Sequence, residues 1–336
     1  MTSVAASPPG TEMAADSPGR AWRAVVEGMS FIVLEQPELW LPALAGFLVR
    51  GGLLLFALPV VVLPSAVGLG NFVGPTSVTA AGPSGGLLAL FIAVLATAIA
   101  WLGAAAVIGS VIDRMLVLRH VELLGGQLSP PNRRGAAATL GELVSIRLLL
   151  LVPVGVAVGW AGQRLVEVGY QELILPTNLD TPLLVRVIGR GADGLLVLAA
   201  VWLACETLGA IAVRQSLMTG ASVPRALAAA AGHLVRHPLS TAATALLGLA
   251  ASAAFLLPAV LGMSAAWNAL RTALVDGLDA SLVVLALTLF LAVWMAGLVL
   301  AGLLAAWRSA IWTGEMVRFG IARSGDRSTA HEAGKL

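Results

Sequence analysis

Several residue types that build soluble enzymes are scarce in this chain. Charged residues make up only 11% of it, against about 25% in a typical soluble domain. The one cysteine, Cys205, excludes an internal disulfide and a cysteine-only metal cluster, and we expect it to be a small core residue. The one lysine, Lys335, lies in the polar tail, which excludes a Schiff base within an apolar segment. A bis-histidine haem inside a membrane is not expected, because the four histidines all fall outside the apolar runs: His120, His233, His237 and His331.

The motifs of common catalytic sites are also absent from the sequence. There is no glycine-rich phosphate loop, no HExxH and no GxSxG. An intramembrane enzyme would need a nucleophile and a base, and no such set stands out. We therefore expect a protein that is not an enzyme, with no catalytic residues, no metal site and no cofactor.

Long apolar runs dominate what is present. Hydrophobic residues make up 58% of the 336, and the mean hydropathy is +0.92. Runs of about 20 apolar residues suffice to cross a bilayer as helices. The sequence predicts an all-α integral membrane protein with one membrane domain, 19–322, between a disordered N-terminal tail, 1–18, and a mobile C-terminal tail, 323–336. Six transmembrane helices are predicted, at about 40–67, 87–112, 144–161, 194–213, 239–261 and 282–307.

The placement of basic residues predicts the orientation. If both termini are cytoplasmic, the inner segments hold 15 of the 20 basic residues and the outer loops hold four. Cytoplasmic loops are enriched in Lys and Arg in this way. We expect N and C termini in the cytoplasm. The strong preference for arginine over lysine favours a GC-rich bacterial genome and hence a bacterial inner membrane.

Two stretches share a layout of amphipathic helix, proline and long apolar helix. They are 19–59, with its break at Pro37, and 221–258, with its break at Pro238; a fainter version at 131–153 lacks the proline. The pattern predicts cytoplasmic amphipathic surface helices and three tandem hairpin units of one orientation. The alternative is a chance likeness between Ala/Leu-rich segments.

The amphipathic stretches carry basic residues that could contact lipid headgroups, each contributing on the order of 1 kcal/mol. The same residues could instead only fix the topology, or form the polar stripe of a surface helix. These candidates for headgroup contact are Arg20, Arg23, Arg225, His233, Arg236 and His237.

Two charged residues lie deep inside predicted spans, whereas Arg147 stands near the start of its span. Arg50 is about ten residues, or ~15 Å, into the first span, and Glu206 is about eight residues, or ~12 Å, from Arg214 at the cytoplasmic end. An unpaired charge at mid-bilayer costs at least ~2.5–3.5 kcal/mol. We therefore expect Arg50 and Glu206 to face the bundle interior and to pair there or to line a polar cavity. Alternatively they never meet, with Arg50 reaching the interface beside Gly51-Gly52 and Glu206 protonated.

The segment VPRALAAAAGHLVRHP, 223–238, and the span after it resemble bacterial six-span membrane proteins of uncharacterised families. Among these is the membrane domain fused to glycerophosphodiester phosphodiesterases. The motif and the span after it cover about a tenth of the chain, and elsewhere only the six-span layout is similar. The resemblance implies no active-site residues here, because the Glu, Asp and His cluster that would bind the phosphodiesterase metal is absent.

The sequence thus favours a structural or accessory membrane protein that binds lipids or other membrane proteins, and no nucleic acid. The alternative is a small transporter or channel with a polar centre at Arg50 and Glu206. A water-filled cavity at the level of these two residues would favour transport. A dry interior with an exposed partner face would favour the accessory role.

Overall fold

The computed structural model describes residues 18–60, 78–79, 82–83, 85–124, 136–175, 177–178, 180–277 and 279–319. These residues are almost all helical, with one antiparallel pair of two-residue strands in which Val78 faces Pro83 and Thr79 faces Gly82. The elements are α1 (Pro18–Glu35), η1 (Pro37–Leu39), α2 (Trp40–Phe47), η2 (Leu48–Gly52), α3 (Leu53–Ala57), β1 (Val78–Thr79), β2 (Gly82–Pro83), α5 (Gly85–Leu123), α6 (Ala136–Ile174), α7 (Leu183–Arg190), α8 (Ala192–Thr219), α9 (Val223–Arg236), α10 (Pro238–Val275) and α11 (Ala280–Arg318).

Six helices in the described part of the chain are long and apolar enough to cross a membrane, which confirms the predicted number by length and composition. They are Pro37–Ala57, Leu88–Leu123, Thr139–Ile174, Ala192–Thr219, Pro238–Val275 and Ala280–Arg318. Helices α5, α6 and α11 have 39 residues each, or about 58 Å at 1.5 Å per residue. They are longer than the apolar runs, because the backbone hydrogen bonds of a helix continue through polar residues. Both predicted tails, apart from Pro18, and the end of the first predicted span, 61–67, lie outside the described residues.

Prolines mark where α1 and α9 end and the next helix begins. Helix α9 ends at Arg236 and α10 begins at Pro238, and α1 ends at Glu35 before η1 begins at Pro37. Proline is tolerated at the first turn of a helix because its missing N–H has no partner there. The middle stretch lacks this proline, and there α6 runs without a break from Ala136.

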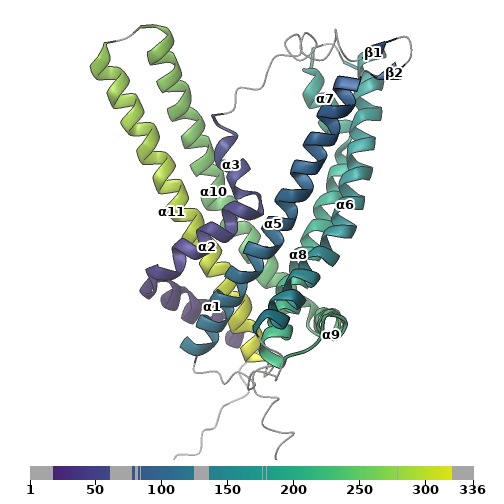
Figure 1. Cartoon of the computed structure of the whole chain (residues 1–336). Coiled ribbons are helices and arrows are strands. Elements are labelled where there is room, and N and C mark those ends of the chain that lie inside the picture. The colour runs from purple at the N-terminus through teal and green to yellow at the C-terminus, as the bar shows by residue number, and fades with distance from the viewer. Residues whose placement is uncertain are drawn as a thin grey trace, which may run out of the picture.

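The long helices form two groups that converge at one end of the molecule (Figure 1). Helices α10 and α11 make one antiparallel hairpin, and α6 and α8 make another pair beside α5. Toward the end farthest from α1 and α9 the two groups diverge (Figure 1). The apolar core is concentrated at the converging end, around Ile211 and Val213 of α8 and Ala306 and Ala310 of α11.

Helix α1 is docked onto the bundle at this end. Met29 and Val33 are buried in a cluster with Ala310 of α11. The Trp22 indole donates a hydrogen bond to Thr244 Oγ1 of α10, and the Trp307 indole donates one to Ser30 Oγ. One face of the first helix therefore packs against the bundle, while Phe31 and Leu34 of the same helix are exposed.

Candidate functional site: a charged cavity between the helix groups

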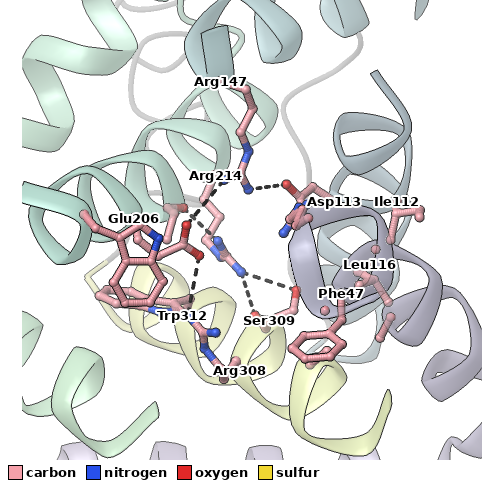
Figure 2. Close-up of a pocket in the computed structure, with 17 residues that line it drawn as sticks. Phe47, Ile112, Asp113, Leu116, Arg147, Glu206, Arg214, Arg308, Ser309 and Trp312 are labelled. Carbon is pink, nitrogen blue, oxygen red and sulfur yellow. Dashed lines mark hydrogen bonds and ion pairs between the residues drawn. The ribbon is translucent and has the colours of Figure 1, made fainter. Parts of the chain in front are cut away.

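A cavity of about 200 Å³ lies where the helix groups converge. Six charged side chains from five elements line it (Figure 2). They are Arg50 of η2, Asp113 of α5, Arg147 of α6, Glu206 and Arg214 of α8, and Arg308 of α11. The remaining lining is mostly apolar, with Trp202 and Trp312 among its larger side chains.

Asp113 joins two of the arginines. Its Oδ1 lies 2.5 Å from Arg50 Nη2, and its Oδ2 accepts a close hydrogen bond from Arg147 Nη2. Arg50 Nη2 also donates to the Gly109 carbonyl oxygen at 2.9 Å. The carboxylate thus holds η2, α5 and α6 together, and its side chain is only 13% exposed.

Glu206 is held more loosely than Asp113. Its Oε1 is 3.4 Å from Arg308 Nη2, and its Oε2 is 3.8 Å from Arg147 Nη1. Its side chain is 30% exposed and points into the cavity between these two arginines (Figure 2). The pair with Arg308 joins α8 to α11, one from each helix group.

Arg214 is the most deeply buried of the four arginines and is held by neutral oxygens. Its Nε donates to Thr313 Oγ1 at 3.1 Å, Nη1 to the Ala210 carbonyl at 2.7 Å, and Nη2 to the Ser309 carbonyl at 2.8 Å. Among the described residues no carboxylate lies within the 4.0 Å of an ion pair with Arg214. The hydrogen bonds satisfy the guanidinium donors, but they do not neutralise its charge.

The cavity therefore has an excess of positive charge. Four arginines face two carboxylates, which leaves two positive charges. Arginine stays protonated in proteins. A buried charge without a counter-charge is costly, so the arrangement favours water and anions in the cavity.

A break in the first apolar helix places Arg50. Within η2, Gly51 has φ 111°, a conformation that L side chains rarely adopt. A Cβ on Gly52 would lie 2.7 Å from the Phe47 carbonyl oxygen and 2.3 Å from its ring. Both glycines are therefore needed for the turn.

The structure brings Arg50 and Glu206 to one cavity without a direct contact between them among the described residues. They are connected through Asp113 and Arg147. Sequence reasoning missed the other four charged residues of the cavity, because each stands near the end of an apolar run. They are Asp113, Arg147, Arg214 and Arg308. One feature of the sequence could have indicated them: several of the apolar runs carry a charged residue at the end that is predicted to be cytoplasmic.

The residues predicted to contact lipid headgroups have different environments. Arg23, Arg225 and Arg236 are exposed, while the side chain of Arg20 lies outside the described part. His233 is buried, with its ring centroid 4.9 Å from that of Phe319, and His237 stacks on the same ring at 4.1 Å. Burial, and secondly the neighbouring His237, lower the pKa of His233.

No group of three or more His, Cys, Asp or Glu side chains that could hold a metal ion occurs among the residues the structure describes. Comparisons with protein-family models, curated proteins and solved structures find no match to this chain. The cavity itself is therefore the basis for assigning a function.

Proposed function

We propose that the protein is a multi-pass transporter of a bacterial inner membrane, with the charged cavity as its solute site. The cavity is the observation that carries this proposal. It places charged groups and water-sized space between two groups of apolar helices, at the level of Arg50 and Glu206. A structural or accessory protein, the function that the sequence alone favours, has no need of such a space.

Insertion in a bilayer is supported by the exposed apolar surface of the helices. Phe91 and Ile92 of α5 are 64% and 56% exposed, and Leu285 and Leu289 of α11 are 64% and 52% exposed. Apolar area on this scale is unfavourable in water and stable against lipid. Of the 15 basic residues that the sequence assigns to the side of the termini, three line the cavity: Arg147, Arg214 and Arg308. The other 12, against four on the opposite side, support termini in the cytoplasm.

A second ion pair supports a position of the cavity inside the membrane. Arg164 of α6 and Asp193 of α8 pair at 3.1 Å at the end of the bundle away from the termini. From these residues to Arg147 and Glu206 the helices rise roughly 20–25 Å. Because a bilayer core is about 30 Å thick, the cavity lies within the membrane, nearer its cytoplasmic face.

Cysteine labelling tests transport against the accessory role. In a Cys205→Ser background, Ala305→Cys places a thiol on the cavity wall, and Ala301→Cys, one turn away on α11, is the matched control with 1% exposure. We expect a membrane-impermeant anionic thiosulfonate to label Ala305→Cys from both sides of the membrane, and to leave Ala301→Cys unlabelled. Labelling from neither side, or from one side under all conditions, would overturn transport.

A further inference from the structure

We infer that the ligand of this cavity is a small oxyanion with two negative charges, of the phosphate or sulfate kind, held by Arg308 and the Ser309 hydroxyl and balanced in charge by Arg214 as well. The inference rests on the proposed function and assigns the substrate class of the same site. Charge balance, the free hydrogen-bond donors and the size of the cavity all support this class.

Charge balance sets the valence of the ligand. Asp113 lies between Arg50 and Arg147, and Glu206 lies between Arg147 and Arg308. Two carboxylates compensate two of the four arginines, and a ligand with two negative charges would compensate the rest. A ligand with one negative charge would leave one arginine without a counter-charge in a site of low dielectric.

Free donors indicate where the ligand sits. In the described part of the chain, the one polar partner of Arg308 is Glu206, so most of its five N–H groups remain available, and its side chain is 32% exposed. Arg214 holds the facing Ser309, whose hydroxyl can donate to a ligand. Figure 2 shows Arg214, Arg308, Ser309 and Glu206 gathered around the same space.

The guanidinium donors and the volume of the cavity further restrict the chemical class of the ligand. Guanidinium groups are planar forks that match the oxygen spacing of phosphate, sulfate and carboxylate. A volume of about 200 Å³ is many times the ~10–15 Å³ that one water needs. A tetrahedral oxyanion with five heavy atoms fits this space together with some water.

Competition binding on the full-length protein tests the class. The protein is placed in phosphatidylcholine nanodiscs, and bound [³⁵S]sulfate is displaced with two pairs of similar shape and different charge. The pairs are sulfate against methyl sulfate, and methyl phosphate against dimethyl phosphate, all at matched ionic strength. We expect the doubly charged member of each pair to compete at least ten-fold better. Equal competition would overturn the inference.

Variants locate the site. We expect Arg308→Gln and Arg214→Gln to weaken sulfate binding at least ten-fold, and Arg308→Lys, which keeps the charge but loses the fork, to weaken it less. Arg164→Gln, which breaks the exposed pair with Asp193, is the matched control and should bind as the wild type does. Size-exclusion profiles check that each variant folds. Unchanged binding in a folded Arg308→Gln would overturn the assignment.

The same chemistry could belong to a free anion or to a lipid headgroup with a phosphate monoester. Nanodiscs that contain phosphatidic acid separate the two sources. If they block sulfate binding, the headgroup is the ligand, and if they do not, the free anion is. If sulfate does not bind but Ala305→Cys is labelled from both sides, the oxyanion assignment is wrong and the transporter proposal stands. If sulfate does not bind and Ala305→Cys is not labelled, both proposals are wrong.

Discussion

At the residue scale, the two carboxylates of the cavity differ in what they hold. Asp113 is in close contact with two arginines, and Glu206 reaches its two arginines at 3.4 and 3.8 Å. Removing one member of a buried ion pair leaves a buried charge without compensation. The tightly held Asp113 is therefore the more important of the two for stability.

Asp113→Asn should destabilise the protein by about 3 kcal/mol, because it leaves Arg50 and Arg147 without a shared counter-charge. Thermal unfolding in nanodiscs measures this. Asp193→Asn, at an exposed pair with Arg164, is the control and should unfold within error of the wild type. Equal effects of the two substitutions would show that Asp113 does not support the fold.

His233 should make the wild type sensitive to acid. Its folded-state pKa lies below the ordinary value of 6.5, so the unfolded chain binds a proton more readily. The stability from this shift is present above pH 6.5 and is lost as the pH falls through the lower, folded-state pKa. We expect His233→Phe to lose less thermal stability than the wild type between pH 7.5 and pH 5. Equal losses would exclude His233 as the cause.

At the element scale, the broken helix gives Arg50 its position. In an apolar helix without a break, the Arg50 side chain would leave the helix in a different direction. Its guanidinium would then not reach the Gly109 carbonyl oxygen. The close approach is visible at Gly109 as well, where a Cβ would lie 2.9 Å from Arg50 Nε. The glycines of η2 are thus part of the site although they carry no charge.

Gly52→Ala should be clearly destabilising, because its Cβ would meet the Phe47 carbonyl oxygen, which is backbone and cannot move aside. Gly51→Ala should cost on the order of 1–2 kcal/mol through its positive φ. Gly103→Ala in α5, with nothing within 4 Å of the new Cβ, is the control and should be neutral or stabilising. Thermal unfolding of the three variants compares them, and a neutral Gly52→Ala would contradict the break.

The sequence predicted the number of apolar helices because hydropathy directly records which segments avoid water. It did not predict their ends: α6 continues to Ile174, far beyond 161, since amphipathic residues extend the same helix. Arg50 and Glu206 were visible because they interrupt apolar runs. Arg147 and Arg308 were not, because a charge at the end of a run also marks a membrane boundary, and one sequence does not show which helices are neighbours.

At the scale of the whole molecule, ion pairs connect the two helix groups near their converging ends. Glu206 of α8 pairs with Arg308 of α11, and Arg214 of α8 donates to Ser309 of α11. Toward the other end the groups diverge (Figure 1). A ligand that binds among these residues would change the contacts between the groups.

Sulfate should therefore alter the distance between the far ends of α8 and α11. Spin labels at Leu196→Cys and Leu285→Cys, both exposed positions, in the Cys205→Ser background report this distance by double electron–electron resonance. Labels at Leu274→Cys and Leu285→Cys, within the α10–α11 hairpin, are the control and should not change. An unchanged distribution for the first pair would argue against relative movement of the groups.

The level of the cavity has an electrical consequence. With the termini in the cytoplasm, as proposed, a dianion that enters from outside crosses roughly 20–25 Å of a core of about 30 Å before it reaches Arg308. At an inside-negative potential of about 100 mV, each charge that crosses fully costs about 2.3 kcal/mol, so this entry costs about 3–4 kcal/mol. Entry from the cytoplasm crosses little of the field, and release to the outside is favourable. If the protein carries the dianion alone, as the proposed function implies, the resting voltage of the cell favours export over uptake.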